Sequence, residues 1–306
     1  MDTLKRSVRA YSNLHVPGPK PNLFIFSTPR SGSTWLMELI RTQPGFKSCE
    51  EPLNLRNPEV RRYLGLSQWQ QLYEPQAAEI LERYFAGFCQ GNLRFMNGNP
   101  LNRYNRLITH RIVFKILHGG EDRIAWFAEK FNGRSVLLLR HPLAVTISRE
   151  AFPRLEAMLT TNFQTHFTAE QLAEAQLILH KGNTLQKGVL SWCLQNSVAL
   201  NQINQNSLVL TYEQLVLEPE PLLHQLAKTA SLSKPEWMIA SLRQPSNSYR
   251  KSDPETRKIL AAEQADKRQL MVSKWRKKVD NTTGAAAMEI LKLFNLELYS
   301  FENDLP

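Results

Sequence analysis

The feature that most constrains this chain is an apolar run, a polar loop and a helical pattern in direct succession between Leu23 and Arg41. The run Leu23–Phe26 is typical of a buried strand, and the apolar spacing after the loop is typical of one helix face. The loop, STPRSGSTW, contains one glycine, one proline, one arginine and five hydroxyl residues. Backbone N–H groups in the first turn of a helix lack partners within the helix, and the helix dipole favours negative charge there. We therefore expect a phosphate-like group to bind at residues 28–35, where Gly32 lets the backbone approach an oxyanion closely.

Strand-like and helix-like segments alternate along the rest of the chain. Further apolar runs, each typical of a buried strand, lie at 112–117, 135–139 and 207–210, and helical patterns separate them. This alternation predicts an α/β fold in which helices cover both faces of a central parallel β-sheet. With the strand–loop–helix unit near the N-terminus, we expect a P-loop-like nucleotide-binding topology.

The length of 306 residues fits one large α/β domain, and we expect a single domain over 1–306. Residues 1–21 are predicted to form a polar N-terminal arm that leads into the first strand. Two regions, 54–110 and 150–183, lie outside the strand–helix alternation. Because such insertions often build the substrate side of a pocket, we expect both of them on the acceptor side.

The composition narrows the class of protein. The net charge of +10 fits either a solvated basic surface or an anionic ligand. Basic residues are spread along the chain and no basic run is interleaved with aromatic residues, so we do not expect a nucleic-acid partner. The three cysteines form no CxxC pair, which is typical of a reduced compartment. The histidines lack metal-ligand spacing, so no metal is expected. The sequence shows neither a membrane span nor a signal-peptide pattern, which predicts a cytoplasmic enzyme.

A second anion site is predicted where the strand 135–139 ends. Arg140 follows this strand directly, and Pro142 suits the first position of a new helix. Ser148, eight residues after Arg140, would project from that helix. Ligands of open α/β sheets bind at the carboxyl ends of the strands. Since the loop 28–35 also follows a strand, both sites should open on the same sheet edge and fit a ligand with separated phosphate groups.

These motifs resemble those of the sulfotransferases that use 3′-phosphoadenosine 5′-phosphosulfate (PAPS). STPRSGSTW is similar to their 5′-phosphosulfate loop, and LLLRHPLAVTIS is similar to their 3′-phosphate segment, in which a serine follows an arginine by eight residues. Residues 210–215 resemble the strand end that helps to hold the adenosine, and 274–277 resemble the basic C-terminal segment that returns to the 3′-phosphate. The match runs from about residue 22 to residue 278, in the order of the family.

The resemblance implies transfer of the sulfonate of PAPS to a hydroxyl or, less readily, an amine by in-line displacement, with release of adenosine 3′,5′-bisphosphate (PAP). It places Arg30 beside the transferring sulfonate, where cytosolic members have a lysine. Because a guanidinium stays protonated, Arg30 can stabilise charge on the leaving oxygen but cannot act as a general acid. The nucleotide contacts that it implies, besides Arg30, are Ser31, Gly32, Ser33, Thr34, Trp35, Arg140, Ser148, Tyr212, Arg276 and Lys277.

Some of these positions have a plainer interpretation. Trp35 could be an ordinary helix-packing residue, and Tyr212 could be a core tyrosine at a strand end. The C-terminal segment lacks the glycines of the family's RKGxxG pattern, so a solvated basic helix is the alternative for Arg276 and Lys277.

Two residues are candidates for the base that takes the acceptor proton. His118 follows the strand 112–117 and precedes Arg140 by 22 residues, close to the separation in the family, and imidazole titrates near neutrality. The other candidate comes from CEEPLN, because Golgi-type members place a catalytic glutamate after the first helix. Adjacent residues of an extended segment point in opposite directions, so only one of Glu50 and Glu51 should face the pocket, and we favour Glu51.

Two other function classes fit parts of this pattern. A P-loop kinase or NTPase also uses a strand–loop–helix unit, but the loop lacks the GxxxxGK[ST] spacing. A non-catalytic basic protein that binds anions is the third possibility. For the sulfotransferase, the expected acceptor is a hydroxyl on a small molecule, a lipid or a glycan, and the sequence makes no prediction of oligomeric state.

Overall fold

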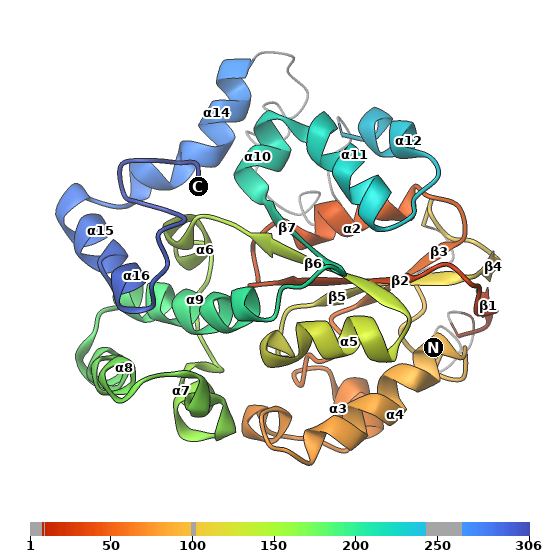
Figure 1. Cartoon of the computed structure of the whole chain (residues 1–306), viewed down its shortest axis with the longest axis horizontal. Helices are drawn as coiled ribbons and strands as arrows, with labels where there is room; N and C mark the ends of the chain where they lie inside the picture. Colours follow the sequence, from red (N-terminus) through yellow and green to blue (C-terminus); the bar gives the residue numbers. More distant parts are fainter. Residues whose placement is uncertain (1–7, 9, 99–101, 243–264) are drawn as a thin grey trace.

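The computed structural model describes residue 8 and residues 10–98, 102–242 and 265–306. The strands of the central sheet are β2 (Asn22–Ser27), β3 (Phe46–Glu50), β5 (Arg111–Ile116), β6 (Gly133–Leu139) and β7 (Ser207–Thr211). Among the described residues they form one sheet in the order β3-β5-β2-β6-β7, and every neighbouring pair is parallel. The predicted α/β fold with a central parallel sheet is confirmed, and its first strand, β2, lies in the middle (Figure 1).

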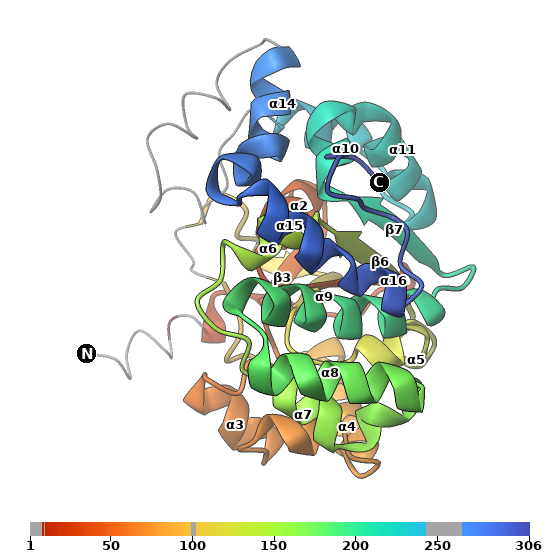
Figure 2. The ribbon, with the colours of Figure 1, turned by 90° about the vertical axis from the view of Figure 1, so that its left-hand side faces the viewer.

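Helices cover both faces of the sheet (Figure 1). One face is covered by α2 (Ser33–Arg41), α10 (Tyr212–Leu217), α11 (Pro219–Thr229) and α12 (Pro235–Ala240). The opposite face is covered by α4 (Ala77–Cys89), α5 (Ile124–Lys130) and α9 (Thr184–Asn201). Further out on that side, α8 (Ala169–Lys181) packs on α9, so α9 lies between α8 and the sheet (Figure 2).

The alternation of side chains along β2 explains why both faces are buried. Leu23 and Ile25 point to one face and pack with residues of α2 such as Leu36. Phe24 and Phe26 point to the other face and enter an aromatic cluster with α4 and α5. A strand that buries both sets of side chains has a continuous apolar sequence, which is the pattern expected for a central parallel strand.

The two predicted insertions contain several short elements. The region 54–110 includes α3 (Pro58–Leu64), the 3-10 helix η1 (Trp69–Leu72), α4 and the short strand β4 (Ile108–Thr109). The region 150–183 includes α7 (Leu155–Thr160), η3 (Asn162–His166) and α8. The predicted arm, of which residues 1–7 and 9 lie outside the described part, includes β1 (Leu14–His15), which pairs in parallel with β4.

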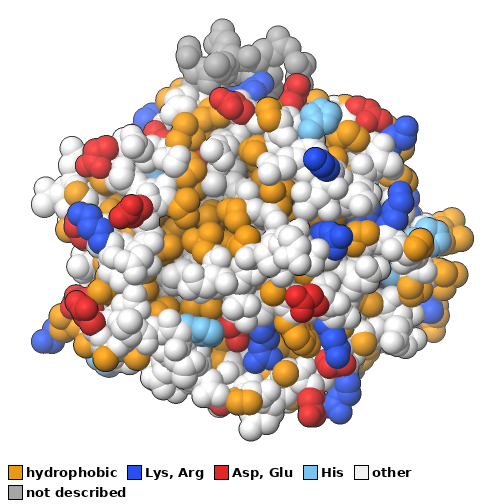
Figure 3. Space-filling model, viewed as in Figure 1, with side chains coloured by type: hydrophobic (Ala, Val, Ile, Leu, Met, Phe, Trp, Pro, Cys, Tyr) orange, Lys and Arg blue, Asp and Glu red, His pale blue; other side chains and the backbone are white. Residues whose placement is uncertain are grey.

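The remaining elements connect and close the fold. Two of them lie next to the sheet, η2 (Glu121–Arg123) before α5 and α6 (Pro142–Thr146) after β6. The C-terminal part comprises α14 (Ala265–Ser273), η4 (Lys274–Lys278), α15 (Asn281–Met288) and α16 (Ile290–Leu293). None of the helices in the described part combines the length and the apolarity that crossing a bilayer requires. On the face shown in Figure 3, basic and acidic side chains are interspersed rather than gathered in one patch.

Candidate active site

The loop between β2 and α2 has the backbone geometry of a tight turn. Arg30 and Gly32 both have a positive φ, 77° and 88°, and Gly32 is the N-cap residue of α2. A Cβ atom on Gly32 would lie 2.5 Å from Cδ2 of Tyr212, so the close packing of the loop on this ring requires a glycine. The hydroxyls of Thr28 and Ser31 share a 2.7 Å hydrogen bond within the turn. The loop is thereby held in one conformation at the start of α2.

Arg140 lies at the adjacent corner, directly after β6, as the sequence predicts. Its Nη1 atom donates a hydrogen bond of 2.8 Å to the carbonyl of Arg30. Its guanidinium carbon lies 4.2 Å from the ring centroid of Tyr212, and Trp192 donates a 2.9 Å hydrogen bond to its carbonyl oxygen. The two corners predicted to bind anions therefore lie on the same edge of the sheet, and Tyr212 packs against both.

A group of polar side chains forms the opposite wall, where β3 and β5 end. Glu51, with φ 54°, turns the chain after β3, and its Oε2 atom lies 3.4 Å from Nε2 of His118. The same oxygen accepts a 3.0 Å hydrogen bond from Nδ2 of Asn54. The Nζ atom of Lys115 lies 3.2 Å from Glu51 Oε1 and donates a 3.0 Å hydrogen bond to the hydroxyl of Thr34. Lys115 thus links this wall to the first turn of α2.

The protonation states of Glu51 and His118 follow from their burial and from the contacts within this wall. Burial raises the pKa of Glu51, but the hydrogen bond to His118 and the charge of Lys115 outweigh burial and lower this pKa to about 2. Burial lowers the pKa of His118; the contact with Glu51 opposes this shift, and the charges of Arg154 and Arg56 add to it. At neutral pH, Glu51 is therefore ionised and His118 is neutral. Because a carboxylate only accepts hydrogen bonds, the ring proton belongs on Nε2, and Nδ1 carries the lone pair.

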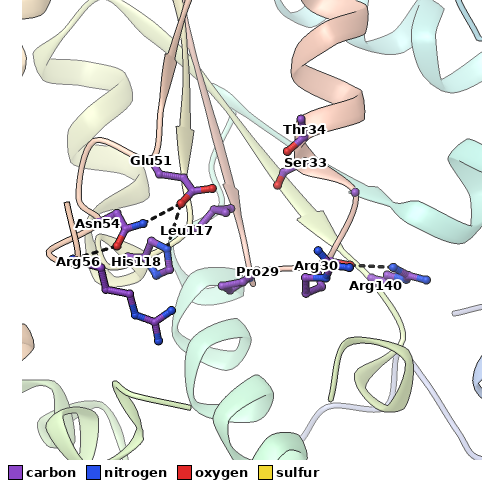
Figure 4. Close-up of a pocket in the computed structure, with 11 residues that line it drawn as sticks. Pro29, Arg30, Ser33, Thr34, Glu51, Asn54, Arg56, Leu117, His118 and Arg140 are labelled. Atoms are coloured by element: carbon purple, nitrogen blue, oxygen red, sulfur yellow. Dashed lines mark hydrogen bonds and ion pairs between the residues drawn. The ribbon is translucent and has the colours of Figure 1, made fainter. Parts of the chain in front are cut away.

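The two walls enclose one open pocket of about 280 Å³ (Figure 4). Its lining residues are Pro29, Arg30, Gly32, Ser33, Thr34, Glu51, Asn54, Arg56, Leu117, His118 and Arg140. In Figure 4 the loop and Arg140 lie on one side, and Glu51, His118 and Arg56 lie on the other. The three residues for which the sequence predicts a catalytic role, Arg30, Glu51 and His118, share this pocket.

Other residues predicted to contact the nucleotide lie beside this lining or away from it. Ser31 is fully buried within the loop, and Trp35 packs edge-on against Tyr212 at 6.3 Å between ring centroids. Ser148 is exposed just after α6, and its hydroxyl donates a 2.8 Å hydrogen bond back to the carbonyl of Ala144.

The two residues of η4 that were predicted to contact the nucleotide, Arg276 and Lys277, lie outside the pocket lining. Arg276 donates a 2.9 Å hydrogen bond from Nε to Oδ1 of Asp304, and its guanidinium lies 4.5 Å from the ring of Trp275. Lys277 is exposed. Neither residue lines the pocket described above.

Asn54 and Arg56 also line the pocket, although neither was predicted from the sequence as a site residue. Both belong to the region 54–110, which the sequence assigns to the acceptor side without naming any residue in it. The only local signal is that they follow Glu51 within five positions, since this stretch shows no regular apolar period.

Comparisons with known proteins find structural likeness but no match in sequence. No protein-family model matches the sequence, and no curated protein is significantly similar to it. Three solved structures similar to this chain are sulfotransferases. One is the sulfotransferase domain of the olefin synthase of Synechococcus PCC 7002, with 18% identity and a TM-score of 0.46 over 95% of this chain and 98% of that chain.

The second is the sulfotransferase domain from the curacin biosynthetic pathway, with 18% identity and a TM-score of 0.47 over 93% of this chain and 100% of that chain. The third is the mouse sulfotransferase SULT7A1 in complex with PAP, with 13% identity and a TM-score of 0.44 over 96% of this chain and 91% of that chain. Likeness at these levels does not establish the activity of this chain.

Proposed function

We propose that this protein is a sulfotransferase that moves the sulfonate group of PAPS to a hydroxyl acceptor by in-line displacement and releases PAP. The observation that carries the proposal is a single pocket with two chemically different ends. One end combines the glycine-containing loop with Arg30 and Arg140. The other end holds Glu51 and His118 in contact. The motifs STPRSGSTW and RHPLAVTIS, which resemble those of the PAPS-dependent family, support the choice of nucleotide.

The cationic end fits a ligand with two separated anionic groups. Arg140 lines the pocket, and among the described residues only the Nη1 atom of its guanidinium has a hydrogen-bond partner, so further N–H groups remain for a phosphate. Ser33 and Thr34 add hydroxyls at the start of α2, where the helix dipole favours an anion. PAPS, when bound, supplies a sulfonate on a phosphate leaving group. In this proposal Arg30 stabilises the negative charge that develops on the leaving oxygen.

The polar wall fits the removal of a proton from the acceptor. Glu51, whose pKa is lowered to about 2, is a weak base at neutral pH. Neutral His118 is the stronger base, and the lone pair on Nδ1 is available to an acceptor hydroxyl. We therefore assign the base to His118 and make Glu51 the positioning residue, as a carboxylate orients imidazole in hydrolase triads. Lys115 contacts both Glu51 and Thr34, so it keeps the base and the loop in fixed relation.

Thermal denaturation with added nucleotides tests the proposal. PAP should raise the melting temperature without added metal, and ATP should raise it less, with no requirement for Mg²⁺. Stabilisation by Mg-ATP alone would overturn the proposal and indicate a P-loop kinase or NTPase.

A mass-spectrometric screen with PAPS and a library of hydroxyl acceptors tests the transfer itself. The wild-type protein should add one sulfonate to at least one acceptor. His118→Asn should keep the stabilisation by PAP but lower kcat strongly, because it retains the shape of the wall and lacks the base. Near-normal turnover by this variant would assign the base to Glu51 instead.

A further inference from the structure

Arg56 lies on the side of the pocket that the nucleotide motifs do not use. Its backbone N–H donates a 3.1 Å hydrogen bond to Oδ1 of Asn54, so a local turn fixes the segment from which the side chain projects. Arg56 lines the pocket, and Figure 4 shows it on the same side as Glu51 and His118, with its guanidinium below the His118 ring in this view. The other two arginines of the lining, Arg30 and Arg140, are on the loop side.

The positive charge of Arg56 is not compensated by an acidic side chain. Other cations of this wall do have such partners: Lys115 lies 3.2 Å from Glu51, and Arg154 lies 2.6 Å from Glu121. Within residues 10–98, 102–242 and 265–306, no carboxylate lies within ion-pair distance of the Arg56 guanidinium. The acceptor side of the pocket therefore carries a cation that is free to bind a ligand.

A second guanidinium adds to the positive potential near Arg56. Burial and, to a smaller extent, the charges of Arg154 and Arg56 together lower the pKa of Arg149 to about 10. The Nη1 atom of Arg149 is buried and has no hydrogen-bond partner in the part of the chain that the structure describes. Because the charge of Arg56 also acts on His118, this positive potential reaches the candidate base.

We propose that the acceptor carries an anionic group, a carboxylate or a phosphate, in addition to the hydroxyl that receives the sulfonate, and that Arg56 binds this group. The inference rests on the proposed sulfotransferase function and specifies its substrate class. Arg56 is exposed, so water satisfies its guanidinium when the pocket is empty. Because Arg56 also lines the pocket that contains His118, an acceptor bound there can replace that water. A planar guanidinium matches two oxygens of a carboxylate or phosphate, and it forms charge-assisted hydrogen bonds with them. With its hydroxyl at His118, the acceptor would extend away from the loop toward Arg56.

Matched pairs of acceptors test this inference. Each pair shares a hydroxyl scaffold and differs in charge through the change of a carboxylate to an amide: 4-hydroxyphenylacetate and its amide, 3-hydroxyoctanoate and its amide, glucuronate and glucuronamide. A further pair, glucose 6-phosphate and glucose, tests a phosphate in place of the carboxylate. For the wild-type protein, kcat/KM should favour the anionic member by about tenfold, as expected for one charge-assisted hydrogen bond. The pairs that show the preference distinguish a carboxylate from a phosphate.

Two variants assign the preference to Arg56. Arg56→Gln should reduce the anionic-to-neutral ratio of kcat/KM to about one, because the amide cannot supply the charge. Arg61→Gln, the same change on an exposed face of α3 outside the pocket, should leave the ratio as in the wild type. Where no member of a pair is turned over, binding to the PAP-loaded protein by saturation-transfer NMR replaces kcat/KM as the readout.

Three results would overturn the inference while leaving the proposed function intact. The first is that the wild type uses anionic and neutral acceptors equally. The second is that Arg56→Gln leaves the anionic-to-neutral ratio of kcat/KM unchanged. The third is that calorimetry shows a loss of PAP affinity in Arg56→Gln. The last result would assign Arg56 to the nucleotide. Failure of the proposed function gives a different result, because the wild-type protein would then neither bind PAP nor consume PAPS. That result would also overturn the inference about Arg56.

Discussion

The guanidinium of Arg140 donates a 2.8 Å hydrogen bond to the carbonyl of Arg30, a residue 110 positions earlier in the sequence. The contact follows from the parallel pairing of β2 with β6, in which Ser27 is opposite Leu138. Because both strands end at the same edge, the loop after β2 and the corner after β6 are neighbours. The spacing between the two candidate anion sites is therefore set by the sheet and not by either motif alone.

Replacing Gly32 by alanine should destabilise the protein more than the same change at Gly65. Both glycines have a positive φ, 88° and 72°, so both replacements introduce backbone strain of about 1 kcal/mol. Only at position 32 would the new Cβ meet Tyr212 at 2.5 Å, whereas nothing lies within 4 Å of position 65. We expect the free energy of unfolding in urea to fall by about 1 kcal/mol for Gly65→Ala and by about 3 kcal/mol for Gly32→Ala. Equal losses would show that the loop does not pack on Tyr212 as described.

The titration of His118 should respond to Glu51 in a defined direction. Burial holds the pKa of His118 below its ordinary value of 6.5, and the contact with Glu51 opposes this shift. Glu51→Gln should therefore move the pKa of His118 further down. Glu50→Gln is the control, because Glu50 contacts Lys115 at 3.8 Å and has no contact with the His118 ring. NMR of the His118 ring protons against pH measures both effects, and a rise in the pKa of His118 in Glu51→Gln would contradict the contact.

The same lowered pKa predicts how stability depends on pH. The unfolded chain protonates this histidine near pH 6.5, and the folded chain does so only at lower pH. Between these two values the unfolded state binds more protons, so the contribution of His118 to stability decreases as pH falls below 6.5. In His118→Asn this contribution is removed, so the unfolding free energy should fall less steeply between pH 6.5 and the folded pKa. An identical pH dependence in the two proteins would contradict the lowered pKa.

A buried ion pair should dominate the stability of the wall behind His118. Arg154 donates hydrogen bonds to Glu121 and to Gln195, each of 2.6 Å, and a 3.1 Å hydrogen bond to the carbonyl of Leu117, next to His118. Arg154→Met leaves Glu121 buried without its partner, which should cost about 3–5 kcal/mol of unfolding free energy in urea.

The exposed pair Lys130–Glu82, 2.9 Å apart, provides the comparison for Arg154. Lys130→Met should cost less than about 1 kcal/mol, because solvent screens both charges. A loss of similar size in Arg154→Met would mean that the buried network contributes little to the wall.

The strands of the sheet differed in how well the sequence predicted them. The apolar run 112–117 is within one residue of the observed β5, because a strand buried on both faces has a continuous apolar sequence. β3, with the sequence FKSCE, was not predicted because it mixes polar and apolar residues. It is an edge strand of the sheet, and its Lys47 is buried with Nζ bonded to Oδ1 of Asn97 at 3.1 Å. That partner lies 50 residues away, so no local pattern could indicate it.

The residues of the candidate site also differ in how much of their arrangement a local sequence pattern could predict. The loop around Gly32 and the corner at Arg140 have local signals, and the structure places both at the predicted sheet edge. Glu51 and His118 were predicted as rivals for one role, whereas the structure brings them into contact at 3.4 Å. That contact depends on the register of β3 against β5, in which Glu50 is opposite Lys115. Register between strands that are far apart in the sequence depends on tertiary structure. The sequence therefore indicated Glu51 and His118 as candidates but could not indicate the contact between them.

The central claim is that the loop 28–35 and Arg140 hold opposite ends of one bisphosphorylated adenosine. Calorimetric titration of PAP and of adenosine 5′-monophosphate into wild type, Arg140→Ala and Arg134→Ala tests it most directly. Arg134 is the control because it lies at the opposite end of the same strand, β6, opposite Leu23. Wild type and Arg134→Ala should bind PAP at least about tenfold more tightly than the monophosphate. Arg140→Ala should bind the two nucleotides equally, whereas an undiminished preference for PAP in Arg140→Ala would contradict the claim.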